Sequence, residues 1–272
     1  MTDVIASLDA WKAAEPDARR GALDAVAGKL GAPWKATTTP LGAHGLLAVR
    51  HDDLDLSLVV VPGGRFQMGV TDAELEEVAR LFGGRGEEAR SVLDPYARPL
   101  RTVTLAPFLF GLRPLTVAQF DALAKGAGRE GGKPDTPAYT YGSGAIAATR
   151  ALGLRLPSEA EWEYVAREGG ARRWLCAPFD EPSFALDAPI TEPNALGIVI
   201  GDVEAVADGE HLSYQGAPAD NAPWEPPADA AVMGRGCHNC WQDEIEAINL
   251  HVAKRAPLNP DGPCFCRPAL SL

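Results

Sequence analysis

The sequence has no long apolar run and no recognisable targeting segment. No apolar stretch reaches the roughly 20 residues that a membrane-spanning helix needs. Residues 1–9 carry neither the cationic start nor the apolar core of a signal peptide. These absences predict a cytoplasmic protein that has no membrane as a partner.

Basic residues are scarce as well. The 25 lysines and arginines face 37 aspartates and glutamates, which gives a formal net charge of −12. Nucleic acids and anionic membranes are bound by positive surfaces that displace their counterions. We therefore expect neither as a partner. The acidic excess favours solubility, and it also allows long-range attraction of a basic protein.

Cysteine is rare and occurs an odd number of times. Four of the five cysteines fall in the last 36 residues, and a secreted disulfide framework would not normally leave one over. Reduced thiols or a local metal site are therefore favoured. The chain does have a hydrophobic share of 46% over 272 residues, which is enough for a large core, and its 28 glycines and 23 prolines are spread as in a loop-rich globular protein.

The N-terminal part has helical periodicity. Apolar residues recur at helical spacing on both sides of Pro16, and Gly31 follows the second run. This pattern predicts two N-terminal helices. Residues 46–61 change to a strand period around a turn at Asp52 and Asp53, which predicts a β-hairpin.

Three capping boxes mark the starts of helices further along the chain. They begin at Thr71, Thr116 and Ser158, each followed three residues later by Glu or Gln. Residues 100–110, between the first two boxes, alternate as a strand, and residues 145–152 have a helical pattern. Short helices are therefore expected to alternate with strands through this part of the chain.

The helix that begins at Ser158 has the strongest signals. Pro157 stops a helix from entering from upstream, and Gly169 with Gly170 supply a left-handed end. Its apolar residues are Ala160, Trp162, Tyr164 and Val165. A helix this short with one broad apolar side is expected to lie on a sheet.

This stretch is also similar to a family signature. Residues 155–163 read Arg-Leu-Pro-Ser-Glu-Ala-Glu-Trp-Glu, which resembles the Arg-Leu-Pro-Thr-Glu-Ala-Glu-Trp-Glu of the formylglycine-generating enzyme, or sulfatase-modifying factor, family. Other family segments lie in the family's order: Val-Pro-Gly-Gly-x-Phe-x-Met-Gly is matched at residues 61–69, Val-Ala-x-Arg at 252–255 and Gly-Phe-Arg at 264–267. The resemblance therefore covers most of the chain from about residue 57 onward.

The resemblance implies the fold. It indicates the α+β class and the formylglycine-generating-enzyme type variant of the C-type lectin fold, which is loop-rich and has little regular secondary structure. We expect an N-terminal helical extension over residues 1–45 and a formylglycine-generating-enzyme-like domain over residues 46–272.

The resemblance also implies where the family's chemistry belongs. In members that make formylglycine, two cysteines with four residues between them hold Cu(I) shortly before the Val-Ala-x-Arg element. Counted back from Val252, these positions fall near Gln242 and Ala247, and neither is a cysteine. The chain thus resembles standalone bacterial members that lack the copper-site cysteines, and no catalytic residue is assigned. An insertion that restores the register with Cys237 and Cys240 stays an alternative.

Four cysteines offer a different metal site. Cys-x-x-Cys at Cys237 and Cys240, followed by Cys-x-Cys at Cys264 and Cys266, suits a tetrahedral thiolate site for zinc or Cu(I). The resemblance implies that the strands carrying the two pairs lie side by side, and Cys264 and Cys266 are expected to share one strand face. Buried thiols are the alternative, since free cysteine is also a small buried hydrophobic residue.

Other metals of the family fit the sequence poorly. Family members often bind calcium near a segment where this chain has Asp202 and, in place of the expected glutamate, Ala205. Calcium needs several charged oxygen ligands, so it is disfavoured, although Asn194 remains a candidate ligand for a first site. The five histidines are scattered singly, which argues against the three-histidine iron site of a sibling branch.

The segment directly after Cys240 is the candidate for partner binding. An aromatic residue flanked by acids suits a basic protein, and the family fold is expected to expose it on a loop. The residues concerned are Trp241, Gln242, Asp243, Glu244 and Glu246. Some of the standalone members that the tail resembles are immunity proteins, which neutralise toxins delivered by type VI secretion. A solvated turn with Trp241 packed into the core is the alternative.

The sequence leaves three hypotheses for the function. The first is a catalytically inactive family member that binds a protein partner, such as a basic secreted toxin. The second is a Cu(I)-dependent oxidase of a cysteine thiol that uses Cys237 and Cys240 as a displaced pair. The third is a structural variant in which zinc bound to the cysteines staples the last strands.

Overall fold

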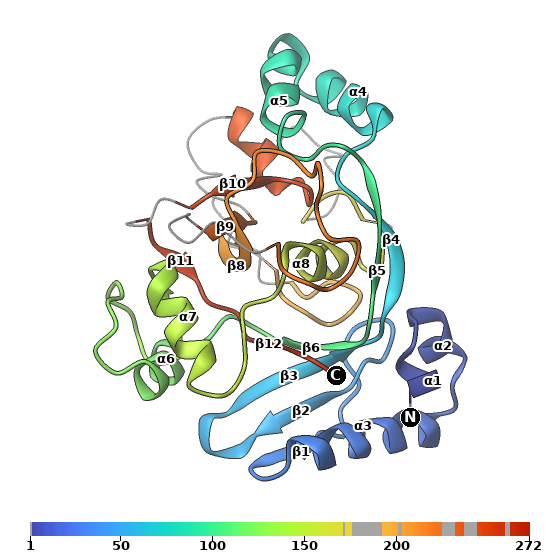
Figure 1. Ribbon diagram of the computed structural model, residues 1–272, viewed down its shortest axis with the longest axis vertical. Coiled ribbons are helices and arrows are strands. Elements are labelled where there is room, and N and C mark those ends of the chain that lie inside the picture. Colours follow the sequence, from blue (N-terminus) through green and yellow to red (C-terminus); the bar gives the residue numbers. More distant parts are fainter. Residues whose placement is uncertain are drawn as a thin grey trace.

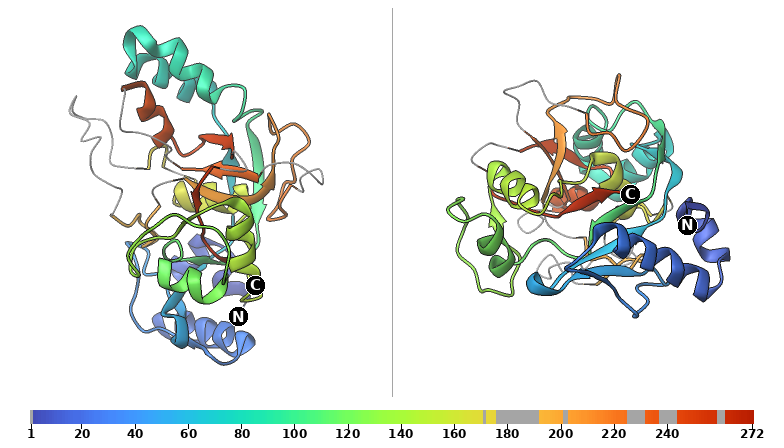
Figure 2. Two further views of the ribbon diagram at one scale, coloured as in Figure 1. Left: turned by 90° about the vertical axis from the view of Figure 1, so that its left-hand side faces the viewer. Right: turned by 60° about the horizontal axis from the view of Figure 1, so that its bottom comes forward.

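The computed structural model describes residues 2–170, 172–175, 192–200, 203–224, 232–236, 244–258 and 262–272. Helices and short strands are mixed along the chain and joined by long loops, so the α+β class and the loop-rich character are confirmed (Figures 1 and 2). Among the described residues, no helix has both the length and the apolar character needed to cross a membrane.

One antiparallel sheet of five strands forms the lower part of the molecule in Figure 1. Its strands, in spatial order, are β1 (Trp34–Ala36), β2 (Ala48–His51), β3 (Leu56–Val61), β6 (Phe108–Gly111) and β12 (Ala269–Ser271). β2 and β3 form the hairpin predicted over residues 46–61, with the 3-10 helix η1 (Asp52–Leu54) at its turn. β12 lies beside β6, so residues near both ends of the chain share this sheet.

A second sheet of five strands is built from the later part of the chain. Its strands, in spatial order, are β10 (Arg255–Pro257), β9 (Val232–Arg235), β8 (Glu204–Gly209), β11 (Cys264–Phe265) and β7 (Tyr139–Thr140). β11 is parallel to β8, and the other pairs are antiparallel. A separate ribbon of β4 (Gly64–Met68) and β5 (Arg101–Leu105) runs along one side of the molecule (Figure 1).

The N-terminal region forms three helices where two are predicted. They are α1 (Thr2–Ile5), α2 (Leu8–Ala13) and α3 (Pro16–Leu30). The additional break falls at Ser7, whose side chain caps α2 by accepting a hydrogen bond from the Ala10 amide at 3.0 Å. Pro16 begins α3 and Gly31 ends it at a φ of 72°, as the sequence predicts.

The N-terminal helices pack onto the same core as the rest of the chain. Trp11 and Leu23 are fully or almost fully buried in a hydrophobic cluster that also contains Val59 and Phe110. β1 follows α3 directly and extends the first sheet at its edge. The domain boundary at residue 45 stays a prediction.

Four further helices follow β4 along the chain. They are α4 (Asp72–Leu81), α5 (Gly86–Leu93), α6 (Val117–Leu123) and α7 (Gly142–Arg150). α7 begins three residues before the helix predicted over residues 145–152. The capping boxes at Thr71 and Thr116 are present. α5 has no sequence signal because Arg85, at its N-cap, makes no capping hydrogen bond. The strand predicted over residues 100–110 is divided into β5 and β6 around Pro107, which has no amide hydrogen to donate.

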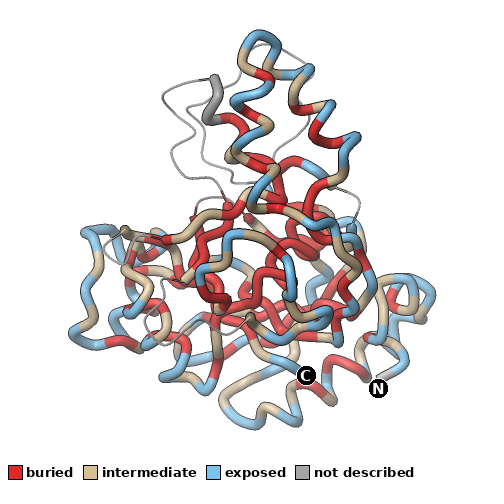
Figure 3. The backbone as a smooth tube through the Cα atoms, turned by 45° about the horizontal axis from the view of Figure 1, so that its top comes forward, coloured by how far each residue is buried: buried red, intermediate tan, exposed pale blue. Residues whose placement is uncertain are grey.

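The helix predicted at Ser158 is α8 (Glu159–Ala166), and it runs through the middle of the molecule (Figure 1). It contacts β4, β5, β8 and β9, which belong to the ribbon and to the second sheet. Buried backbone gathers around this centre in Figure 3, whereas the N-terminal helices and the α4–α5 region carry long exposed stretches. α8 is therefore the element around which the rest of the fold is assembled.

Candidate functional site

The central helix begins at a capping box that is also an ion pair. Ser158 Oγ accepts a hydrogen bond from the Glu161 amide (3.2 Å), and Glu161 Oε2 accepts one from the Ser158 amide (3.0 Å). The same carboxylate accepts two hydrogen bonds from the Arg155 guanidinium, at 2.6 and 2.7 Å. The predicted helix start is confirmed, and the charge of the capping carboxylate is balanced by Arg155.

All eight residues of α8 are buried, which the sequence did not predict. Its expected polar side carries Glu159, Glu161 and Glu163, whose exposed fractions are 2%, 0% and 0%. A charged side chain is buried at acceptable free energy only when it is paired and hydrogen-bonded. The prediction of one apolar side was therefore incomplete, because arginines cover the other side.

Two arginines from the second sheet supply most of this pairing. Arg255 of β10 donates to both oxygens of Glu159, at 2.6 and 2.7 Å. Arg235 of β9 donates to Glu163 at 2.6 Å and lies 3.4 Å from Glu159. Arg167, just after α8, donates to the other oxygen of Glu163 at 2.7 Å. The result is one buried cluster of three guanidinium and two carboxylate groups.

Tyr214 completes the cluster. Its hydroxyl oxygen accepts a hydrogen bond from Arg235 at 2.9 Å. The guanidinium carbons of Arg101 and Arg255 lie 5.2 and 4.7 Å from the centre of its ring, within the range of cation–π attraction. Burial raises the pKa of Tyr214, so this phenol stays protonated over the physiological range.

A second buried ion pair also contacts α8. Arg267 donates to both oxygens of Glu204 on β8, at 2.7 and 2.5 Å. The indole nitrogen of Trp162 donates to the same carboxylate at 3.0 Å. Glu204 therefore joins the central helix to the segment that leads into β12.

Asp208 is a buried carboxylate whose acidity is perturbed. It accepts hydrogen bonds from the Glu159 amide (2.6 Å) and the Trp224 amide (2.8 Å). Burial raises the pKa of Asp208 to about 7, and the nearby Glu159 carboxylate contributes to the rise. Asp208 thus links the start of α8 to the end of the loop that follows β8.

The cluster extends toward α4 through Arg167 and Glu74. Arg167 Nη1 lies 3.3 Å from Glu74, which also belongs to the capping box of α4. His251 stacks edge-to-face on Trp174, with ring centres 4.9 Å apart. Burial, together with the nearby Arg167 charge, lowers the pKa of His251 to about 3, so the ring is neutral.

These groups form a structural network. Each buried carboxylate of the cluster faces a guanidinium or backbone amides, so its lone pairs are engaged inside the protein. The sequence analysis missed the arginine partners. A signal was present, because the two C-terminal segments that resemble the family, at residues 252–255 and 264–267, contain Arg255 and Arg267.

The structure places two of the four candidate metal-ligand cysteines. Cys264 and Cys266 are free and fully buried, and Cys266 Sγ donates to the Ala145 carbonyl at 3.3 Å. Burial raises the pKa of Cys264 to about 12 and raises that of Cys266 as well, so in the absence of a metal ion both are thiols. Cys237 and Cys240 lie outside the described residues.

The prediction that the two cysteine-bearing segments lie on neighbouring strands is wrong. β8 lies between β9, which leads to Cys237, and β11, which carries Cys264. Hydrogen-bonded neighbours are about 4.8 Å apart, so the intervening strand separates the two segments by about twice that distance. Within the part of the chain that the structure describes, no three His, Cys, Asp or Glu side chains are grouped to hold a metal ion.

The structure describes one of the two copper-site positions that the family resemblance implies. Ala247 is fully buried in the 3-10 helix η3 (Glu244–Leu250), and its methyl group has no metal-binding atom. Gln242 lies outside the described residues. A two-cysteine Cu(I) site in the family register therefore does not fit this chain.

The structure describes only the last part of the predicted partner-binding segment, from Glu244 onward. Trp241, Gln242 and Asp243 lie outside the described residues, so their predicted exposure stays a prediction. Glu244 and Glu246 begin η3, whose backbone is helical where a loop was expected. The structure describes only the backbone at these two positions.

The candidate calcium ligand Asn194 is engaged within its own loop. Its side-chain oxygen accepts hydrogen bonds from the Leu196 and Ile198 amides at 3.0 and 3.1 Å. Its amide nitrogen donates to the Val165 carbonyl at 2.9 Å. Asn194 thus fixes a turn against α8 and does not present a free oxygen, and Ala205 is fully buried in β8.

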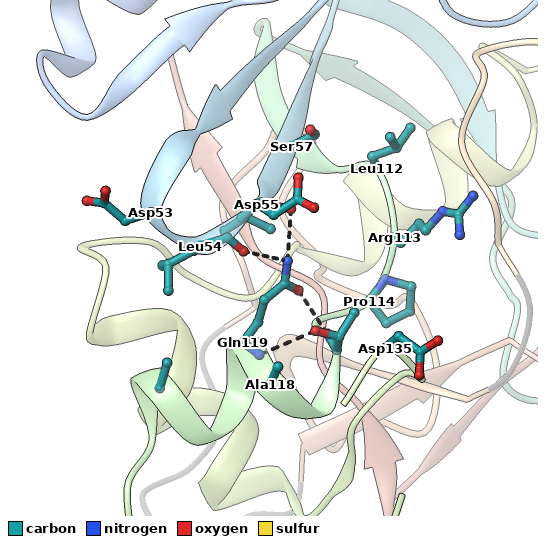
Figure 4. A pocket seen from close by; sticks show the side chains of 13 residues that line it. Asp53, Leu54, Asp55, Ser57, Leu112, Arg113, Pro114, Ala118, Gln119 and Asp135 are labelled. Carbon is teal, nitrogen blue, oxygen red and sulfur yellow. Dashed lines mark hydrogen bonds between the residues drawn. The ribbon is translucent and has the colours of Figure 1, made fainter. Parts of the chain in front are cut away.

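A pocket of about 620 Å³ opens between η1 and α6 (Figure 4). Gln119 lies at its centre and donates to the carbonyl oxygens of Leu54 and Asp55, both at 3.0 Å. Figure 4 shows the charged groups of Asp53 and Arg113 directed to opposite sides of the pocket. The polar groups of the lining therefore do not converge on one ligand position.

Comparison with known proteins agrees with this architecture. Among solved structures, PvdO from Pseudomonas aeruginosa is similar at a TM-score of 0.66 and 24% sequence identity, over 87% of this chain and 100% of that one. Treponema denticola variable protein 1 is similar at a TM-score of 0.53 and 14% identity, over 89% of this chain and 100% of that one. At these identities the likeness concerns the fold.

Sequence comparison identifies the family. No curated protein matches the chain. The model of the sulfatase-modifying factor enzyme 1-like domain matches residues 50–196, which is more than half of the chain and includes the whole of α8. The chain therefore belongs to the formylglycine-generating enzyme, or sulfatase-modifying factor, family.

Proposed function

We propose that this chain is a catalytically inactive member of its family that works in the cytoplasm by binding a protein partner. The main support for this proposal is the position of Ala247. Its fully buried methyl group lies close to where the resemblance requires the second copper ligand. Cys264 and Cys266 give no replacement in the family register, because they follow the Val-Ala-x-Arg element at residues 252–255 and the family's copper ligands precede it. Without a metal site in that register, the role left to the scaffold is to present a surface.

The proposed partner is a protein with a basic surface. The net charge of −12 supports it, because opposite charges speed encounter and select partners. The resemblance of the C-terminal region to standalone bacterial members makes an immunity protein that neutralises a type VI secretion toxin the specific form of this proposal.

Co-purification tests partner binding directly. The product of each gene that flanks this one would be co-expressed with the tagged chain and purified in 150 mM salt. We expect one of them to form a stable 1:1 complex, measured by size-exclusion chromatography with light scattering. Failure of every flanking gene product to bind would contradict the proposal.

Copper binding separates this function from the oxidase alternative. The purified chain would be titrated with Cu(I) against a competing chelator, and oxygen uptake would be measured with a cysteine-containing peptide. We expect neither stoichiometric binding nor uptake. Binding of one Cu(I) per chain together with oxygen uptake, both lost in Cys237→Ser, would establish the oxidase instead.

A further inference from the structure

α4 and α5 form a helical hairpin that projects from the body of the molecule (Figures 1 and 2). The helices pack closely because α5 begins with Gly86, where a Cβ would lie 2.2 Å from the Ala79 carbonyl oxygen. Their buried residues include Leu75, Val78, Ala89 and Leu93. We call residues 72–93 the α4–α5 hairpin.

The base of the α4–α5 hairpin is fixed to the buried network. Glu74 accepts a hydrogen bond from the Thr71 amide at 2.8 Å and pairs with Arg167 near the end of α8. One turn further along α4, Glu77 pairs with Arg173. Arg98 also bridges Asp72 at the start of α4 and Asp94 just after α5, which both lie at the base. Ion pairs from three segments thus hold the direction in which the hairpin projects.

The hairpin carries a concentrated negative charge. Seven acidic and three basic residues lie between Asp72 and Asp94. Some of the acids are paired at the base, but Glu76 and Glu87 are exposed and have no ion-pair partner within the described residues. Arg98, Arg167 and Arg173 balance the acids at the base, whereas the carboxylates of Glu76 and Glu87 face solvent.

The tip of the hairpin is apolar. Leu81 is 47% exposed, and Phe82 next to it is half-buried. The glycines that follow, Gly83 and Gly84, have open space around the position of a Cβ, so nothing in the described chain covers the turn. An apolar group within a charged rim is the usual composition of a protein-binding surface.

The hairpin also lies beside the end of the predicted partner-binding segment. α5 contacts η3, which begins at Glu244. Residues 241–250 add three acidic residues and no basic one. Together with the hairpin they hold six of the twelve net negative charges in 32 residues, so charge complementarity points to a basic occupant.

We propose that the α4–α5 hairpin is a docking surface for a basic protein, with Leu81 as its apolar anchor and Glu76 and Glu87 as its attracting charges. This proposal rests on the proposed function, because it names the surface through which a partner binds. Attraction by the exposed carboxylates speeds association, and burial of Leu81 slows dissociation.

The test compares two double charge reversals with the same total charge. Glu76→Lys with Glu87→Lys changes the hairpin, whereas Asp24→Lys with Asp135→Lys changes exposed positions on α3 and beside α6, away from the hairpin in Figure 1. Binding to the co-purifying flanking gene product would be measured by surface plasmon resonance at several salt concentrations. Thermal unfolding of each variant would confirm that it is folded.

We expect the hairpin reversal to lower the association rate by about tenfold or more and to weaken its salt dependence. The control reversal should change the rate by less than about threefold, and Leu81→Ser should raise the dissociation rate. Equal effects of the two reversals would overturn the hairpin proposal while the complex itself upheld the proposed function. If no flanking gene product binds at all, both proposals fall.

Discussion

Glu159 and Arg255 meet through two hydrogen bonds of 2.6 and 2.7 Å although 96 residues separate them in the chain. Both side chains are almost completely buried. Bidentate pairing of this kind is directional, because the planar guanidinium presents two parallel donors to the two carboxylate oxygens. The pair therefore fixes the orientation of β10 against the start of α8.

Breaking this pair should destabilise the protein strongly. In Arg255→Met the carboxylate of Glu159 is left buried without its main counter-charge, and the expected loss is about 3–5 kcal/mol of unfolding free energy, measured by urea denaturation. The double variant Glu159→Met with Arg255→Met should recover part of it, since no isolated charge remains. Arg50→Met, which breaks the exposed pair with Asp55, is the control and should have little effect. If Arg50→Met lost as much unfolding free energy as Arg255→Met, this account would be contradicted.

Asp208 should make stability fall as pH rises toward neutrality. Its folded-state pKa of about 7 lies above the ordinary value of 3.8, so between these two values the folded chain binds more protons at this site than the unfolded chain does. The stabilising contribution is complete below about pH 4 and is lost as pH rises to about 7. In Asp208→Asn this slope should disappear. Identical pH profiles of unfolding free energy in the two proteins would refute the assignment.

His251 should act in the opposite direction. Its pKa of about 3 in the folded chain lies below the ordinary value of 6.5, so the unfolded chain binds the extra proton between these values. Stability from the neutral ring is complete above about pH 6.5 and is lost as pH falls toward 3. His251→Gln should therefore show a shallower acid limb in chemical denaturation between pH 6 and 4. An unchanged acid limb would show that the ring is protonated inside the fold.

The thiols of Cys264 and Cys266 should resist alkylation in the native state. The thiolate is the reactive form, and burial keeps both groups protonated. Iodoacetamide at pH 8 should label these two positions only after denaturation, as read by peptide mass spectrometry. A chelator should leave the melting temperature unchanged. A lower melting temperature after chelation, with zinc in the purified chain, would favour the zinc-stapled variant.

Local signals in the sequence predicted helix starts, whereas the fold class was predicted from the resemblance to the family. The capping boxes at Thr71, Thr116 and Ser158 involve residues three positions apart, so neighbouring letters contain the whole interaction. The break at Ser7 was missed because the following apolar periodicity continued across it. These successes and errors both reflect interactions within a few residues.

The burial of α8 was not predictable in the same way. Glu159 and Glu163 look like the solvent side of an amphipathic helix until their distant partners Arg235 and Arg255 are placed. Strand order has the same limitation, since nothing in the two cysteine segments indicates that β8 separates them. The candidate partner surface needed the structure too, because charge counts do not show that the α4–α5 hairpin projects.

The pairing of α8 with Arg235 and Arg255 has a consequence for biosynthesis. Because a ribosome makes the chain from its N-terminus, the glutamates of α8 emerge about 70 to 100 residues before these arginines. Until then, the helix that the finished protein buries most deeply holds carboxylates that favour water. Native packing at the centre of the molecule must therefore wait for the C-terminal strands, and a nascent chain halted before them should remain open to chaperones and proteases.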